Sequence, residues 1–163
     1  MNRARILEAY AAIGEATPMK TDCGSLCAAA CCRPDADGQG GVALLPGEAE
    51  PLSGIDWGAI ERDEAMDAPM LVCTDPCDRE KRPFLCRVFP LCPVIGKDGR
   101  WTVRMDARAR AVCPLAGSGL RALDPEFVRG AAKAARILAE DPEGEAFLTR
   151  WAEIEAEFRK PLF

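Results

Sequence analysis

Nine cysteines and no histidine among 163 residues constrain this chain more than any other feature of its sequence. Without imidazole, the chain lacks the groups for Ser-His-Asp and Cys-His nucleophilic catalysis, for HExxH zinc proteolysis and for histidine-rich metal sites. Any metal site must therefore use thiolate, carboxylate or backbone oxygen. The thiols are not needed to hold a very small fold together, because a chain of this length buries a genuine core.

The cysteine content also differs from that of a secreted disulfide scaffold. Nine cysteines in 163 residues fall below the roughly 8–10% typical of such chains, and an odd number would leave one thiol unpaired. The first residues are basic, but Glu8 and Glu15 occur before any apolar stretch long enough for a signal peptide. We therefore expect a cytoplasmic protein, and in that reducing compartment clustered cysteines more often bind metal or act in catalysis than form disulfides.

The charge balance narrows the range of partners. The chain has 26 acidic and 21 basic side chains, for a formal charge of −5. A nucleic-acid interface needs arginine and lysine concentrated on one face, and a membrane span needs about 20 consecutive apolar residues. We therefore expect neither a nucleic acid nor a membrane among the partners of this protein.

Apolar spacing predicts an α+β fold in a single domain over residues 1–163. Helical spacing indicates an N-terminal helix within 2–16, a helix through the cysteines of 23–32 and another at 56–66. Short apolar runs predict extended segments at 42–45 and 69–73. Two further runs flank an Asp-Gly pair, which predicts a β-hairpin within 91–105.

The last forty residues carry the signals of two successive helices. Asp124-Pro125-Glu126 and Asp141-Pro142-Glu143 each offer an N-cap, a first-turn proline and an early acid. Apolar side chains recur at helical spacing after each signal, at Phe127, Ala131, Ala134 and Leu138 and then at Phe147, Trp151, Ile154 and Phe158. Residues 124–159 are therefore expected to form a helical hairpin, whose outer face is a candidate surface for a protein partner or a homodimer.

Two pairs of cysteines have the spacing of a structural metal site. Cys27 and Cys31 are separated by three residues, as are Cys73 and Cys77, within the C-x(2–4)-C window that zinc sites use. Cysteines four apart on a helix hold their Cβ atoms about 5–6 Å apart, whereas a disulfide needs roughly 3.5–4.5 Å. A metal ion bridges sulfurs at the longer separation, so the two pairs can converge on one tetrathiolate site.

Charged residues near the thiols are candidates for supporting roles. Arg82 and Arg87 flank Cys86, and their guanidinium groups would offset the net charge of about −2 on a four-thiolate zinc centre. The carboxylates near the motif that could serve as oxygen ligands are Glu48, Glu50 and Asp75. Glu48 and Glu50 are expected to be surface acids, with metal ligation as the alternative.

Three cysteine motifs together resemble the YkgJ-type zinc- or iron-chelating domain family. They are Cys27-Ala-Ala-Ala-Cys31-Cys32, the step from Cys73 to Cys77, and Arg82-Pro-Phe-Leu-Cys86-Arg-Val-Phe-Pro90. The last matches the family's Arg-Pro-x-x-Cys-Arg-x-(Phe/Tyr)-Pro signature at every defining position, and the resemblance covers roughly residues 22–95. It implies metal chelation, and a related domain is present in flagellin lysine methylases.

We therefore expect a small, irregular, cysteine-rich metal-binding core at 22–113, containing a β-hairpin and braced by the C-terminal helical hairpin. The expected ligands are Cys27, Cys31, Cys32, Cys73, Cys77 and Cys86. Cys23 is a further candidate from the first cluster, and Cys92 and Cys113 are added on number and proximity alone. Zinc is the expected metal, with iron or an iron-sulfur cluster as the alternative, because thiolates suit both. The expected function is metal binding in a structural or metal-carrying role. The alternatives are an iron-sulfur redox protein, a methylase-associated enzyme, and a protein-interaction module with a structural metal.

Overall fold

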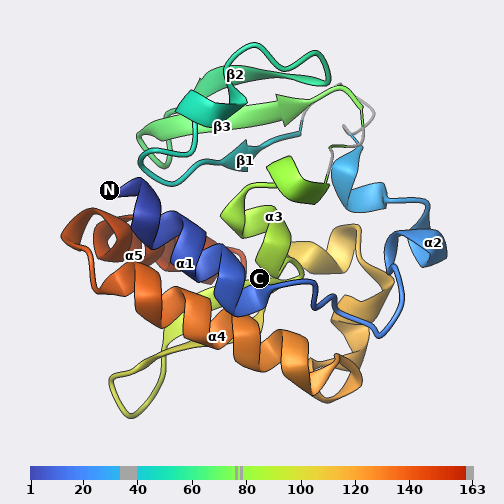
Figure 1. Ribbon diagram of the computed structural model, residues 1–163. Coiled ribbons are helices and arrows are strands. Elements are labelled where there is room, and N and C mark those ends of the chain that lie inside the picture. Colours follow the sequence, from blue (N-terminus) through green and yellow to red (C-terminus); the bar gives the residue numbers. More distant parts are fainter. Residues whose placement is uncertain (34–39, 76, 78, 161–163) are drawn as a thin grey trace.

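The computed structural model describes residues 1–33, 40–75, 77 and 79–160. Figure 1 shows an α+β arrangement in which α1, α4 and α5 lie below the sheet of β1, β2 and β3, with α3 between them and α2 to one side. The predicted α+β class, with a hairpin and two C-terminal helices, is confirmed. Within the described part of the chain, no helix is long and apolar enough to cross a membrane.

The two C-terminal helices begin where the sequence predicts. Helix α4 spans Pro125–Ala139 and helix α5 spans Pro142–Glu157. The Asp124 carboxylate accepts a 2.7 Å hydrogen bond from the Glu126 amide, and the Asp141 carboxylate accepts one of 2.9 Å from the Glu143 amide. Each aspartate therefore caps amides that have no partner within the helix.

The apolar stripe of α4 is buried along its whole length, as expected, but that of α5 is buried only at its start. Phe147 is buried, Trp151 and Ile154 are half-buried, and Phe158 is 62% exposed. The stripe of α5 is therefore not covered at Phe158, although the last turn is held to its neighbours because the buried Glu155 carboxylate accepts from the Ala107 amide at 2.8 Å. Whether a partner or a second copy covers this end stays a prediction.

Helix α1 (Arg3–Ile13) packs across α4 at a position that requires glycine. A Cβ atom on Gly130 would lie 2.8 Å from the carbonyl oxygen of Ala12. The absence of a side chain at Gly130 lets the two helices approach closely enough to bury Ala9, Ile13 and Phe127 in one apolar core.

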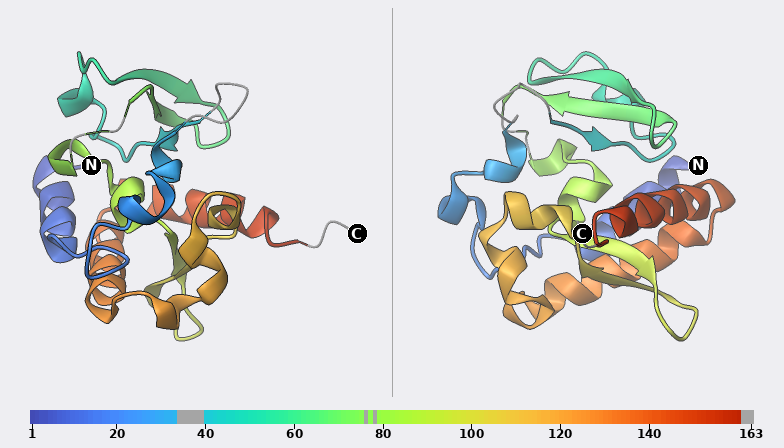
Figure 2. Two further views of the ribbon diagram at one scale, coloured as in Figure 1. Left: turned by 90° about the vertical axis from the view of Figure 1, so that its right-hand side faces the viewer. Right: turned by 180° about the vertical axis from the view of Figure 1, so that it is seen from behind.

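The predicted hairpin is formed by strands β4 (Leu91–Ile95) and β5 (Trp101–Met105), which pair antiparallel from Leu91 opposite Met105 to Ile95 opposite Trp101. Strand β5 packs on α4 and strand β4 packs on α5, as the two further views show (Figure 2). Because Leu91, Val103 and Trp101 are buried against these helices, the hairpin belongs to the same core as the C-terminal pair.

A second sheet holds strands β1 (Val42–Ala43), β2 (Gly58–Asp63) and β3 (Ala68–Cys73) in the order β1-β3-β2, with antiparallel pairing. The helix predicted at 56–66 is therefore wrong. Residues 58–63 pair with 68–73 over their whole length, and the Asp63 carboxylate accepts the Met66 amide at 3.0 Å to close the turn. Helical spacing across a run this short does not exclude a strand when a partner strand follows.

The cysteine-bearing segments are made of very short elements. Helices α2 (Gly24–Cys27) and α3 (Phe84–Val88) each span little more than one turn. The remaining turns are 3₁₀ helices: η1 (Ala30–Cys32), η2 (Glu50–Leu52), η3 (Arg79–Lys81), η4 (Arg108–Ala111), η5 (Pro114–Ser118) and η6 (Leu120–Ala122).

The continuous helix predicted through 23–32 is also wrong. Ala28 and Ala29 have φ values of 50° and 55°, in the left-handed region, and they separate α2 from η1. Alanine favours a right-handed helix by propensity, so the local tertiary arrangement has overridden that preference at these two residues.

Candidate metal centre

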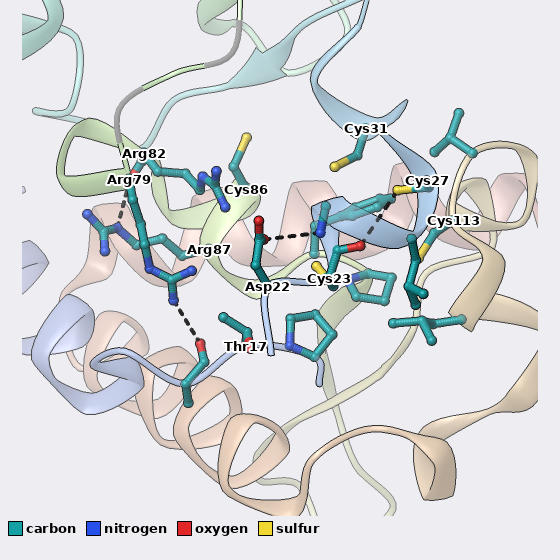
Figure 3. A pocket seen from close by; sticks show the side chains of 18 of the residues that line it. Thr17, Asp22, Cys23, Cys27, Cys31, Arg79, Arg82, Cys86, Arg87 and Cys113 are labelled. Carbon is teal, nitrogen blue, oxygen red and sulfur yellow. Dashed lines mark hydrogen bonds between the residues drawn. The ribbon is translucent and has the colours of Figure 1, made fainter. Parts of the chain in front are cut away.

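Eight of the nine cysteines lie in one neighbourhood, at the junction of α2, η1, the end of β3, α3 and the start of η5. They are Cys23, Cys27, Cys31, Cys32, Cys73, Cys77, Cys86 and Cys113. Five of them surround a hollow of about 60 Å³, shown in Figure 3, in which Cys86 and Arg82 come from the side opposite Cys27 and Cys113. Thiols from segments up to 90 residues apart are thus brought together by the fold (Cys23 to Cys113).

The left-handed pair in the first cysteine segment divides its thiols between two hollows. Cys23 and Cys27 line the hollow of Figure 3, Cys32 lines a larger neighbouring cavity, and Cys31 borders both. The Ala29 amide donates to Gly24 at 3.0 Å and the Cys32 amide donates to Ala29 at 2.8 Å, so the reversal is held by the backbone itself. The sulfurs of Cys31 and Cys32 then lie 3.9 Å apart.

The first sulfur group comprises Cys32, Cys73, Cys77 and Cys86, gathered around the Arg82 guanidinium. The thiol of Cys77 contacts that of Cys32 on one side and Arg82 on the other. The contact with Cys32, followed by burial, raises the pKa of Cys77. Burial raises the pKa of Cys73 to about 11, and burial raises that of Cys86 well above its ordinary value.

The second sulfur group comprises Cys23, Cys27 and Cys113, with Cys31 between the two groups. The Cys27 thiol lies 4.0 Å from the carbonyl oxygen of Cys23. Burial raises the pKa of Cys23, and the negative charges of Asp22, Cys113 and Cys27 raise it further. Hydrogen bonding from Cys32 lowers the pKa of Cys31, which is also the exposed cysteine of the set.

A buried carboxylate positions the helix that carries Cys86. Glu48 is 2% exposed and accepts hydrogen bonds from the Phe84 amide at 2.8 Å, from the Leu45 amide at 2.8 Å and from the Tyr10 hydroxyl. Burial raises the pKa of Glu48 despite these donors. The expectation of Glu48 as a surface acid is therefore wrong, and its oxygens are occupied in holding the start of α3.

The two arginines of the signature have different roles. Arg87 lines the hollow of Figure 3, but its guanidinium is engaged elsewhere: its Nε and Nη2 donate at 2.7 Å to the carbonyls of Arg82 and Glu80, and it lies 4.1 Å from the centre of the Tyr10 ring. Arg82 faces the sulfurs, and its pKa is raised by the neighbouring thiols, Cys77 first, although its burial opposes this. Of the two, Arg82 is the one placed to offset thiolate charge.

Cys92 lies apart from the other thiols. It is on β4 with no exposed surface, and its thiol is 3.4 Å from the carbonyl oxygen of Pro93. Burial, with the nearby carboxylates of Asp106 and Glu155, raises its pKa to about 12. The structure therefore brings Cys113, but not Cys92, into the sulfur neighbourhood. The sequence alone offers no reason to prefer either of these two cysteines as a ligand.

Among the described residues, no three cysteine, aspartate or glutamate side chains are already close enough together to hold a metal ion. The thiols are gathered in two groups, but they do not converge on one point. Binding an ion at either group would require side chains to turn inward. Most of these cysteines lie on short turns, whereas Cys73 is the last residue of strand β3 and is paired with Gly58.

Sequence reasoning missed one assembly beside the sulfurs. The Arg108 guanidinium lies 3.9 Å from the centre of the Trp151 ring, and two of its nitrogens donate to the buried Asp106 carboxylate at 2.9 and 2.6 Å. Arg108 and Trp151 are 43 residues apart, in η4 and α5, so no local pattern links them.

Comparisons of this chain with models of protein families, with curated proteins and with solved structures found no match.

Proposed function

We propose that this chain is a metal-binding protein that chelates zinc through cysteine thiolates, in a structural or metal-carrying role. One observation carries the proposal: eight thiols from distant segments gather in one neighbourhood around Arg82, in a protein without histidine. Buried cysteines that serve only as small apolar side chains have no reason to cluster, and Cys92 is the example of that ordinary role.

The ligands that we propose are those of the sulfur neighbourhood expected from spacing: Cys27, Cys31, Cys32, Cys73, Cys77 and Cys86. The four nearest Arg82, in the first sulfur group, have the composition of a tetrathiolate site. The Arg82 guanidinium would offset the charge of about −2 that four thiolates leave on a zinc ion. Cys23 and Cys113 adjoin the set as the nearest additional thiols.

The thiols of the first sulfur group should release protons when metal binds. Burial and mutual contact raise the pKa of Cys73, Cys77 and Cys86, so these groups hold their protons at neutral pH in the absence of metal. Thiolate is the form that binds metal, so each ligand must lose a proton on binding. A zinc titration in weakly buffered solution should therefore release several protons per chain.

Iron is the second candidate, favoured by the number of thiols. Eight sulfurs exceed the four that a single zinc ion takes, and they would serve an iron-sulfur cluster or a second ion. Elemental analysis and an absorption spectrum of protein purified without oxygen decide between them. A colourless protein with zinc excludes the cluster, whereas a brown protein with iron excludes simple zinc chelation. Protein that carries neither metal, with its cysteines paired in thiol titration, would rule out chelation.

A pair of matched variants tests the ligand set. Cys86→Ala should lose bound metal, because it removes a thiol from the first sulfur group. Cys92→Ala removes one sulfur from the same chain outside both groups, and it should retain the metal. Metal is measured by elemental analysis of the purified proteins, and circular dichroism confirms that each variant is folded. Equal metal content in the two variants contradicts the proposed centre.

A further inference from the structure

A cavity of about 420 Å³ lies between the first sulfur group and helix α5. This volume is within the range of about 300–1,000 Å³ found for sites that bind small organic molecules. Cys32, Cys73 and Cys86 border one end, where the proposed metal would be held, and Arg108 and Trp151 border the cavity as well. Arg108, Asp106 and Trp151 belong to neither sulfur group, whereas Arg82 borders both the cavity and the first sulfur group.

The walls combine a large apolar area with a few charged groups. Leu85, Phe89, Leu91, Val112 and Trp151 supply apolar surface. The charged side chains on the wall are three arginines and one carboxylate, namely Arg33, Arg82, Arg108 and Asp106. Mostly apolar lining with a few fixed polar groups is the composition of small-molecule sites, and the excess of guanidinium groups favours an anion.

Arg108 is held in place before any ligand binds. Its Nε and Nη2 donate to the Asp106 carboxylate at 2.9 and 2.6 Å, and the Arg108 amide donates to the same carboxylate at 2.9 Å. The guanidinium plane is also stacked on the Trp151 ring at 3.9 Å. These contacts fix the group without using Nη1, which has no hydrogen-bond partner among the described residues. A preorganised donor of this kind costs little conformational entropy when it binds an acceptor.

Two residues that border the cavity each carry an unpaired nitrogen below its surface. Trp151 Nε1 and Arg82 Nε are buried atoms without a hydrogen-bond partner in the described part of the structure. The donor left for a ligand in the cavity is therefore Arg108 Nη1, which can bind an acceptor without giving up another hydrogen bond within the described part of the protein.

We propose that this cavity binds a small organic carboxylate with a flat apolar body. The carboxylate oxygens accept hydrogen bonds from Arg108, whose Nη1 is unpaired among the described residues, and the apolar body lies against Phe89 and Leu91. Arginine forms its strongest hydrogen bonds with carboxylates, and the aromatic and aliphatic walls favour a ring over an extended polar chain.

The indole N–H signals of the protein provide a direct test, with 2-naphthoate as the probe. The chain has three tryptophans, so a ¹⁵N–¹H spectrum contains three indole signals, and Trp151→Phe identifies that of Trp151. Titration should shift the Trp151 signal saturably and leave those of Trp57 and Trp101 in place. The neutral analogue 2-naphthalenemethanol should bind at least about tenfold more weakly, because it lacks the charge that Arg108 recognises.

Matched variants complete the test. Arg108→Met should weaken 2-naphthoate binding about tenfold or more, whereas Arg110→Met, in the same turn but exposed and outside the cavity, should leave it unchanged. Val112→Phe fills part of the cavity from its exposed rim, and it should also weaken binding even if Arg108→Met fails to fold. A Trp151 signal that does not move, equal shifts of all three signals, or equal affinity of the two arginine variants would overturn the proposal.

Discussion

The helical core and the sulfur neighbourhood of this protein are built in opposite ways. Helices α4 and α5 span 15 and 16 residues, begin at capping aspartates and bury side chains such as Phe127 and Leu138 completely. In the sulfur neighbourhood, α2 has four residues and no side-chain cap, and its cysteines are half-buried or exposed. Burial of apolar surface stabilises the first region and extends to α3 through Phe84, Leu85 and Val88. In contrast, α2 and η1 bury no residue and depend on something that joins their thiols.

This difference implies that the two regions respond to separate perturbations. A change in the helical core should alter the stability of the whole chain, whatever the state of the thiols. A change at the thiols should first release the short segments that carry them. The four predictions below run from the largest expected effect to the smallest.

Removal of metal should separate the two regions most clearly. A strong chelator applied to the metal-loaded protein should speed amide hydrogen exchange in 23–32 and 79–86 by more than about a hundredfold, because the segments lose their shared ligand. Exchange in α4 should change by less than about tenfold, because its core contains no proposed ligand. Hydrogen exchange followed by mass spectrometry measures both regions at once, and a uniform change across the chain would contradict the division.

Substitution in the helical core should have the opposite pattern. Phe127→Ala removes a fully buried ring and should lower the free energy of unfolding by about 3–5 kcal/mol. Urea unfolding should give the same loss with and without chelator. Phe158→Ala removes the same side chain at a position that is 62% exposed, and it should cost less than about 1 kcal/mol. A loss for Phe127→Ala that disappears in chelator would show that the two regions are not independent.

Glu48 links the two regions, and its effect should depend on pH. In the native protein a backbone amide donates to each carboxylate oxygen of Glu48. Glu48→Gln places its NH₂ group against one of these donors, which should lower the free energy of unfolding by about 1–3 kcal/mol. Because burial raises the folded-state pKa of Glu48 above its unfolded value, the stability that this group contributes is complete below the unfolded pKa. It is lost as pH rises through the folded pKa.

The advantage of the native chain over Glu48→Gln should therefore shrink as pH rises from about 4 toward neutrality. Urea unfolding across this range, with excess chelator so that metal release does not enter the titration, provides the measurement. A gap between the two proteins that stays constant or widens would show that the Glu48 pKa is not raised by folding.

The smallest effect is expected at the left-handed turn. Ala28→Gly should stabilise the segment by up to about 1 kcal/mol, because glycine adopts positive φ without the steric cost that alanine carries. Ala30→Gly, in η1 beyond the turn, should give no gain. Competition with a chromophoric chelator measures metal affinity for both variants. Tighter binding by Ala30→Gly than by Ala28→Gly would mean that the left-handed turn does not limit the site.

Local signals predicted the hairpin and the C-terminal helices correctly. An Asp-Gly pair and two capping aspartates act within a few residues, so their consequences are visible in the sequence. The spacing of Trp57 and Ile60 predicted a helix because nothing local reveals that 68–73 will pair with 58–63. The left-handed Ala28 was equally hidden, since alanine gives no sign of positive φ.

The candidate site shows the same limit. Spacing and the family resemblance selected the cysteines that the fold gathers, but neither separated Cys92 from Cys113. That distinction depends on tertiary position, because one thiol lies on a strand packed against α5 and the other on a turn near α2. The stacked pair of Arg108 and Trp151 is likewise a product of tertiary contact alone.

The rate at which Cys92 is alkylated reports how often the folded protein opens. Eight cysteines lie where a thiol-directed alkylating reagent reaches the sulfur neighbourhood, whereas Cys92 has no exposed surface and lies between the hairpin and α5. A reagent can therefore label the ninth sulfur only after strand β4 leaves the helix. Mass spectrometry would follow the fraction of chains that still carry one unlabelled cysteine. The decay of that fraction measures the opening rate, and no engineered label is needed.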